Sequence, residues 1–152
     1  MRDVSKCDMD HVYKLIIEIN RRIHHYHIEN IEEDEMKTHH DLDVWKRSIE
    51  FVKIIYTFTE KLPKDEKYGL VSQMRRCVVS IASNIAEGAA RHHQKEFIQF
   101  LYHSLGSTSE LETQIILAND LELVATEESI LEELYRIQQM LSGLIRFLKN
   151  KR

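Results

Sequence analysis

Nine histidines are the residues of this 152-residue chain that most invite a metal or catalytic interpretation. They gather beside an acidic segment and at expected helix joints, as in His24, His25, His27, His39 and His40. Adjacent histidines point to different sides of a helix, and no H-E-x-x-H pattern occurs that would place two imidazoles over one zinc ion. We therefore expect no metal site.

The hydroxyl and thiol side chains do not form a recognisable nucleophile site either. Cys7 and Cys77 are too far apart for a zinc pattern, which favours reduced thiols in a cytoplasmic protein. The chain has no phosphate-binding glycine loop. Four serines of the middle helices lie in no G-x-S-x-G turn: Ser80, Ser83, Ser107 and Ser109. The sequence thus predicts no enzyme, no cofactor and no small-molecule substrate.

Charge is unevenly distributed along the chain, whose net charge is −4. Residues 36–95 carry a net charge of +4, whereas residues 1–35 and 96–152 each carry −4. Such a layout suits either nucleic-acid binding or complementary contacts between subunits, and simple solvation of a charged surface is the alternative. The candidate contacts to nucleic acid are Lys46, Arg47, Lys53, Lys61, Lys64, Lys67, Arg75 and Arg76.

The elements that must position these residues are helices. The chain has only one proline and four glycines, the residues that most often form the turns between strands. This composition favours an all-helical protein. Apolar residues recur at helical spacing in five segments, residues 12–26, 43–62, about 66–91, 94–121 and 126–148. Short joints make neighbouring helices antiparallel, so the last four segments predict an all-α, up-down-up-down four-helix bundle. We expect Asp43 and Thr126 to cap two of these helices and Pro63 to end another.

The remaining segment predicts an additional N-terminal helix. Its stripe of Val12, Ile16, Ile19, Ile23 and Tyr26 is narrow and is followed by an acidic, histidine-rich linker. We therefore divide the chain into an extension, residues 1–40, and a bundle domain, residues 41–152. The polar start does not resemble a signal peptide, and no apolar run is long enough to cross a membrane.

The segment SIASNIAEGAAR carries polar residues and a glycine along the edge of a core stripe. Small residues here and in SLGSTS are expected to let two antiparallel helices approach closely, which would explain Gly106 in the middle of a helix. We expect a polar cluster that fixes helix register or a subunit contact, with solvent-facing residues as the alternative. Its members are Asn84, Glu87, Gly88, Arg91, Ser107 and Glu110.

These motifs, together with DLDVWKRSIEFV and KEFIQFLYHSLGSTSELETQI, resemble the bacterial 23S rRNA-intervening-sequence proteins over about residues 41–149. The resemblance implies a four-helix bundle that assembles as a ring-shaped homopentamer. Related accessory proteins of diversity-generating retroelements are similar and bind nucleic acid. Family members usually begin near the DLxVWK motif, so residues 1–35 are either an extra helix or the product of an upstream start before Met36.

Two functions follow as hypotheses. The first is a non-enzymatic oligomeric module that binds RNA or DNA as an accessory factor. The second is a structural or protein-interaction scaffold without nucleic-acid binding. Residues 36–152 balance 16 basic against 16 acidic side chains, whereas the nucleic-acid-binding relatives are strongly basic, and this difference weakens the transfer of nucleic-acid binding to this chain.

Overall fold

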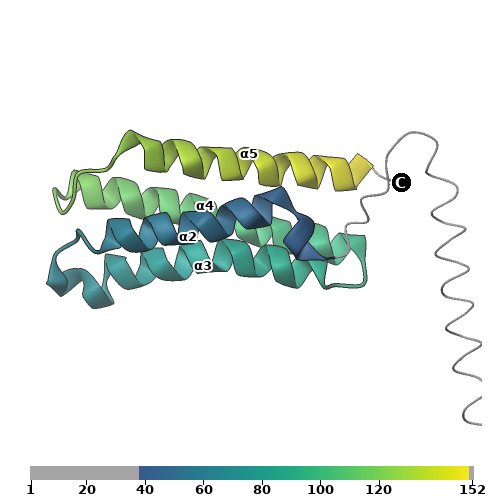
Figure 1. Ribbon diagram of the computed structural model, residues 1–152, viewed down its shortest axis with the longest axis horizontal. Helices are drawn as coiled ribbons and strands as arrows, with labels where there is room; N and C mark the ends of the chain where they lie inside the picture. The colour runs from purple at the N-terminus through teal and green to yellow at the C-terminus, as the bar shows by residue number, and fades with distance from the viewer. Residues whose placement is uncertain (1–37, 151–152) are drawn as a thin grey trace, which may run out of the picture. The chain divides into compact units, whose positions relative to one another are not determined.

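The computed structural model describes residues 38–150 (Figure 1). The chain divides into two units, residues 1–35 and 36–152, and every described residue belongs to the second. The predicted N-terminal helix and the histidines at positions 24–27 lie outside the described residues, so the interpretation of the extension stays a prediction.

Four α-helices form an antiparallel bundle in which each helix packs beside the next (Figure 1). α3 and α4 pack together most extensively, and α2 and α5 close the bundle with the least contact. The predicted all-α four-helix bundle is confirmed. The elements are η1 (His39–Asp41), α2 (Asp43–Thr59), η2 (Lys64–Tyr68), α3 (Leu70–Ala89), α4 (Gln94–Asp120) and α5 (Glu128–Asn150).

The core follows the apolar stripes of the sequence. Each stripe meets the others along the bundle axis, where burial of aliphatic and aromatic side chains provides the main stabilisation. Ser48 is buried among them because its hydroxyl donates a 2.7 Å hydrogen bond to the carbonyl of Val44. Fully buried large side chains include Phe51, Ile55, Phe58, Met74, Ile81, Ile85, Leu101, Leu111, Ile115, Leu134, Ile137 and Leu141.

Helix ends differ from the sequence expectations at two caps. Asp43 is the first residue of α2, and Leu42 occupies the cap position without a side-chain bond. The capping box lies one element earlier, between Thr38 and Asp41 at η1. α5 begins at Glu128, so Thr126 is not its cap. The backbone N–H of Thr126 instead donates to the side chain of Asn119, which ties the loop back to the end of α4.

The surroundings of two glycines correct the expectation that close helix packing explains Gly106. A Cβ added at Gly106 would meet nothing within 4 Å, so close helix packing does not explain this glycine. At Gly88 a Cβ would lie 2.6 Å from Phe100 Cβ and 2.9 Å from Phe97 Cδ2. The close approach of α3 and α4 therefore requires glycine near the end of α3 rather than in the middle of α4.

Candidate interaction surface

Half of the predicted basic residues are neutralised by ion pairs. Lys46 lies 3.6 Å from Asp43, and Lys53 lies 2.8 Å from Glu50, in each case within one helix. Two further cations bind carboxylates near the start of α5: Lys61 binds Glu127, just before the helix, at 2.8 Å, and Arg47 binds Glu133 of α5 at 2.5 Å. These four residues do not form a continuous belt of free positive charge.

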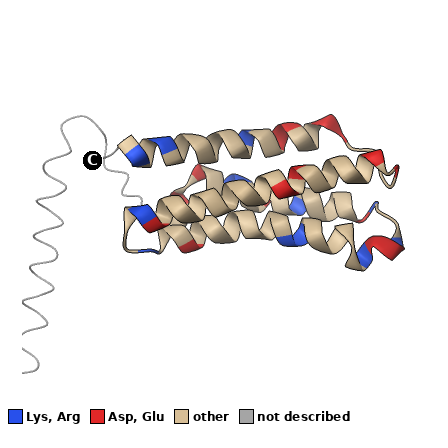
Figure 2. Ribbon diagram, turned by 180° about the vertical axis from the view of Figure 1, so that it is seen from behind, with Lys and Arg blue, Asp and Glu red and all other residues tan. Residues whose placement is uncertain are grey.

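The other four basic residues, Lys64, Lys67, Arg75 and Arg76, surround η2 and the start of α3. Within residues 38–150 none of them forms an ion pair. Two pack against aromatic rings: the Arg75 guanidinium lies 4.5 Å from the ring centre of Tyr56, and Lys67 lies 5.4 Å from that of Tyr68. Tyr68 is 85% exposed. Figure 2 shows acidic residues beside them in η2, and further acidic residues at the start of α5, at the same end of the bundle.

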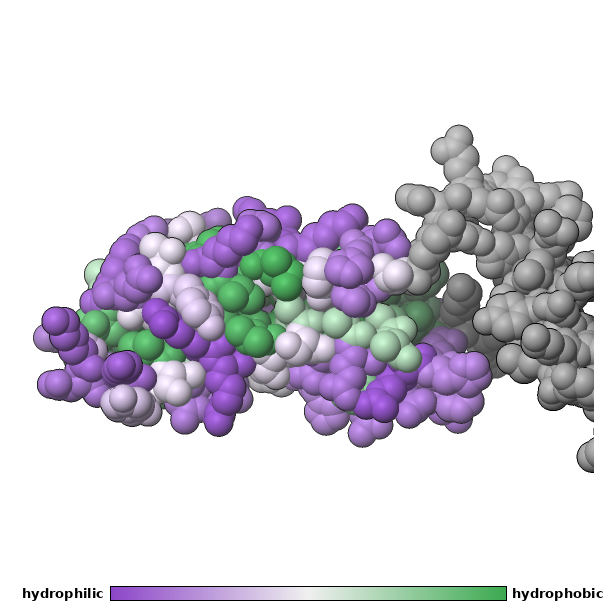
Figure 3. Space-filling model, turned by 60° about the horizontal axis from the view of Figure 1, so that its bottom comes forward, coloured by the Kyte–Doolittle hydropathy of each residue, from purple (hydrophilic) through white to green (hydrophobic). Residues whose placement is uncertain are grey.

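A band of apolar side chains runs along the outer side of α2 and α3 (Figure 3). Arg75 donates a hydrogen bond to Thr59 and stacks on Tyr56, which sets the register of the two antiparallel helices. One turn further along each helix, this register places Val52 beside Val79. We call Val52, Tyr56 and Val79 the α2–α3 face. Tyr56 and Val79 are each 40% exposed.

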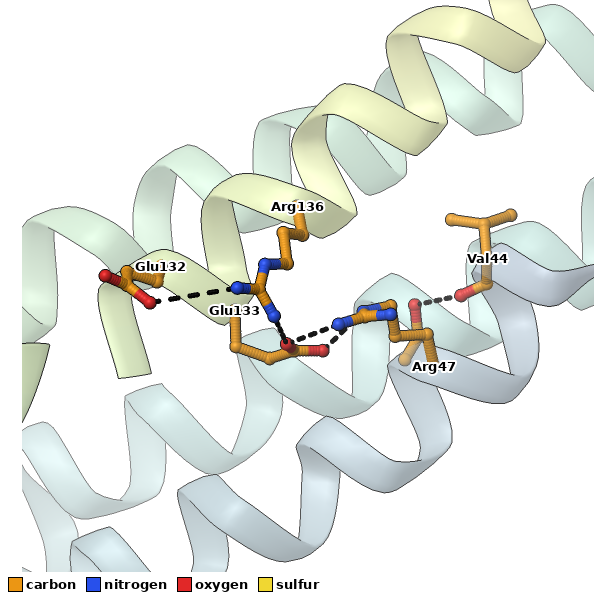
Figure 4. A network of polar contacts seen from close by, with 6 residues as sticks. Val44, Arg47, Glu132, Glu133 and Arg136 are labelled. Carbon is orange, nitrogen blue, oxygen red and sulfur yellow. Dashed lines mark hydrogen bonds and ion pairs between the residues drawn. The ribbon is translucent and has the colours of Figure 1, made fainter. Parts of the chain in front are cut away.

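The seam between α2 and α5 carries charge instead. Glu133 binds Arg47 of α2 and lies 3.6 Å from Arg136, which in turn lies 3.8 Å from Glu132 (Figure 4). The hydrogen bond that Arg47 donates to Glu133 raises the pKa of Arg47 above its ordinary value. Likewise, the ammonium group of Lys61 lowers the pKa of Glu127.

Hollows along this seam do not have the features of an active site. They are open to solvent, and the titratable groups that line them include the same paired residues, Lys61, Glu127, Glu133 and Arg136. A carboxylate held by a neighbouring cation is a poor general base, because pairing stabilises its charged form. Among the described residues, no three His, Cys, Asp or Glu side chains are placed to hold a metal ion.

The predicted polar cluster separates into three groups in the structure. Asn84 donates to the backbone oxygen of Ser80 at 2.9 Å and to its hydroxyl at 3.0 Å, and Ser107 donates to the same hydroxyl at 3.1 Å across the α3–α4 interface. Glu87 pairs with Arg91 instead. The structure thus brings Asn84 and Ser107 together through Ser80, a residue that we did not include in the cluster.

Arg91 and Glu110 belong to the other two groups. The Arg91 guanidinium lies 4.8 Å from the ring centre of Phe100, next to Gly88. Glu110 accepts a 3.2 Å hydrogen bond from Gln114, whose amide also lies 3.5 Å from Cys77 Sγ. Burial and, to a smaller extent, the nearby carboxylate of Glu110 together raise the pKa of the Cys77 thiol to about 11. This thiol is therefore protonated and unreactive at neutral pH.

We expect Ser80 and Asn84 to be energetically coupled. A double-mutant cycle of Ser80→Ala and Asn84→Ala, measured by urea unfolding, should give a coupling of about 0.5–1 kcal/mol. Asn84 and Glu110 make no contact in the structure and provide the matched control, for which the two losses should add. A coupling of zero between Ser80 and Asn84 would show that the group does not act as a unit.

The residues that form the bundle are similar in sequence to known proteins. A sequence model of the 23S rRNA-intervening sequence protein family matches residues 40–143, more than half of the chain. The chain belongs to this family. Membership in the 23S rRNA-intervening sequence protein family confirms the resemblance drawn from the motifs around Trp45, Asn84 and Glu110.

A crystal structure of a protein from a family with a similar description has the same fold. It is a protein of unknown function from the S23 ribosomal protein family of Bacteroides thetaiotaomicron VPI-5482, one of four solved chains that match. The two chains are 27% identical, with a TM-score of 0.63 over 68% of this chain and 95% of the other. No curated protein matches the chain.

Sequence reasoning did not identify the α2–α3 face of this 23S rRNA-intervening sequence protein. The signal was present, because Trp45, Ile49 and Val52 form a second apolar stripe beside the core stripe of α2. Whether such a stripe is buried depends on what the neighbouring helix covers. Here Trp45 packs edge-on against His39 and His40, Ile49 lines a hollow with Met140 of α5, and all three side chains of the stripe stay partly exposed. None of the helices within residues 38–150 is long and apolar enough to span a membrane.

Proposed function

We propose that this protein is a non-enzymatic helical bundle that assembles with copies of itself and acts as a protein-interaction scaffold. The observation that carries the proposal is the exposed apolar α2–α3 face. Apolar side chains gathered on one surface, with charged residues on either side, are typical of interaction sites. The family resemblance makes a homopentamer the expected stoichiometry, and the free thiol of Cys77 fits a cytoplasmic location.

Light scattering coupled to size-exclusion chromatography tests this proposal. We expect a species several times heavier than the 18.1 kDa chain, and five times heavier if the stoichiometry implied by the family resemblance holds. Because association is governed by mass action, the measurement should cover a hundredfold range of protein concentration. A mass of 18.1 kDa throughout that range would overturn the proposal.

Nucleic-acid binding is the second candidate function. It is supported by the unpaired cations Lys64, Lys67, Arg75 and Arg76 and by the exposed ring of Tyr68 in the same region. In a ring these residues would repeat once per subunit, so that weak contacts to phosphate would add together. Such binding would be independent of sequence and sensitive to salt.

A fluorescence-anisotropy titration with structured RNA and with duplex DNA tests this function. If the second function holds, binding at low salt should weaken as salt rises, and replacing Lys64 and Lys67 with glutamate should reduce the steepness of that dependence. Lys53→Glu is the control, because Lys53 is already paired with Glu50. Absence of binding at the lowest salt concentration would leave the scaffold as the sole function.

A further inference from the structure

We propose that the ion pair between Arg47 and Glu133 is a latch that holds α5 on the bundle, and that α5 opens as a unit when this pair separates. We call the pair the α2–α5 latch. The inference concerns motion within a single chain, so it goes beyond the proposed function and does not depend on self-association.

Of the four α-helices, α5 has the least contact with the rest of the bundle. Within residues 38–150 it lies against α4 and α2 but not against α3, whereas α3 packs on both α2 and α4. The element with the fewest contacts generally opens at the lowest free energy. We therefore expect α5 to open more easily than the α3–α4 pair. Its contacts with the core come from one stripe, Ile130, Leu134, Ile137, Leu141, Ile145 and Leu148.

The α2–α5 latch joins two atoms of each partner (Figure 4). Arg47 Nη2 donates to Glu133 Oε2 at 2.7 Å, and Arg47 Nε lies 2.5 Å from Glu133 Oε1. Such a bidentate contact is stronger and more directional than a single ion pair. The Glu133 side chain is only 18% exposed. The second pair across this seam, Lys61 and Glu127, is exposed on both sides, so solvent screening leaves it little effect on stability.

Open hollows interrupt the apolar contact between α2 and α5 on both sides of the latch. Glu133 lines both of them, and their volumes are about 510 Å³ and about 700 Å³. Phe58 and Ile130 line the first hollow, and Ile49 and Met140 line the second. A closely packed interior has few voids larger than one water molecule. Apolar packing therefore holds this seam less firmly than a continuous core would, and the ion pair carries a larger share.

The joint between α4 and α5 provides a pivot for this motion. The backbone N–H of Leu123 donates to the carbonyl of Ala118 at 3.0 Å, and that of Thr126 donates to Asn119 Oδ1 at 3.2 Å. These bonds fix the joint to the end of α4 as far as Thr126. Because α5 begins at Glu128, it can turn about the short segment between these two residues while α2, α3 and α4 stay in place.

Opening of α5 has a consequence that can be measured. A helix of 23 residues with one apolar stripe owes most of its stability to packing, so the detached segment loses much of its helical structure in water. Its backbone amides then exchange hydrogen with the solvent, whereas those of α3 remain protected until the whole bundle unfolds. Hydrogen exchange along the chain therefore distinguishes opening of α5 from unfolding of the whole bundle.

The experiment is hydrogen exchange of the full chain, followed by mass spectrometry at several urea concentrations below the unfolding transition. We expect α5 to exchange about tenfold faster than α3 and with a smaller dependence on urea, because partial opening exposes less surface. Arg47→Ala should accelerate exchange of α5 by a further factor on the order of ten, as expected for loss of a charged hydrogen bond. Lys53→Ala is the matched control, because Lys53 lines the same seam but pairs with Glu50 of its own helix, and it should leave α5 unchanged.

Glu133→Gln removes the charge of the latch but keeps its shape, and it serves if Arg47→Ala does not fold. It should also accelerate exchange of α5, and the double variant should show less than the product of the two separate effects, because both changes disrupt one interaction. Equal exchange rates and equal urea dependence in α3 and α5 would overturn the opening of α5. Exchange of α5 that neither substitution accelerates would overturn the latch. Neither result would alter the mass measured by light scattering, so failure of this inference is distinct from failure of the proposed function.

Discussion

Replacing Gly88 with alanine should destabilise the bundle by about 1–2 kcal/mol, although alanine is the better helix former. Intrinsic propensity alone would favour the substitution by up to about 1 kcal/mol. The new Cβ, however, would lie 2.6 Å from Phe100 Cβ, an atom that can move only if α4 moves. Overpacking of this kind costs about 1–3 kcal/mol, so the steric effect should dominate.

Urea unfolding followed by circular dichroism would measure this loss. Gly106→Ala is the control, since the same substitution there meets open space and should leave stability unchanged or raise it by up to about 1 kcal/mol. Repeating both measurements at several protein concentrations separates any contribution from association. A Gly88→Ala variant as stable as the unmodified protein would show that α3 and α4 do not approach as closely as described.

The buried thiol of Cys77 should make the protein less stable in alkali. Its pKa is raised to about 11 in the folded state by burial and by Glu110, whereas the ordinary value is 9.0. Folding therefore favours the neutral thiol, and this contribution is fully present below about pH 9 and is lost as pH rises from 9 to 11. A rise from 9.0 to about 11 corresponds to about 3 kcal/mol.

Other groups also titrate between pH 8 and pH 10.5, so the effect of Cys77 is measured as the difference between the unmodified protein and a variant that lacks the thiol. The free energy of unfolding of the unmodified protein and of Cys77→Ala should be compared at pH 8 and pH 10.5. Alanine cannot ionise, and its variant should lose less stability between the two values. Equal losses in both proteins would mean that Cys77 is not held in its neutral form.

The helices and their core faces could be predicted from the sequence because they depend on local periodicity. Phe51, Ile55 and Phe58 follow one another at helical spacing, and any fold that buries one of them buries all three. Pro63 follows α2, but the helix already ends at Thr59, three residues before the end at Leu62 that the periodicity predicted. The motifs around Asn84 and Glu110 identified the family for a related reason, since they lie within the contiguous stretch that the family model matches.

Caps were harder to predict because several polar residues compete for each helix end. Thr126 has a suitable side chain, but Asn119 holds its backbone N–H from the preceding helix, and α5 begins two residues later. Asn119 lies seven residues before Thr126 and belongs to α4. Local sequence rules do not take such a partner into account.

What the sequence by itself determined is the all-α bundle, its core stripes and its family. Only the tertiary structure decided which surface residues are free to act. Arg47 and Glu133 are 86 residues apart, and their pairing gives a carboxylate partner to a residue that we predicted as a nucleic-acid contact. Val52 and Val79 form a shared face only because α2 and α3 pack in one register. Periodicity along a chain specifies which side of each helix is buried, whereas contacts between helices depend on register and rotation, which packing sets after the helices have formed.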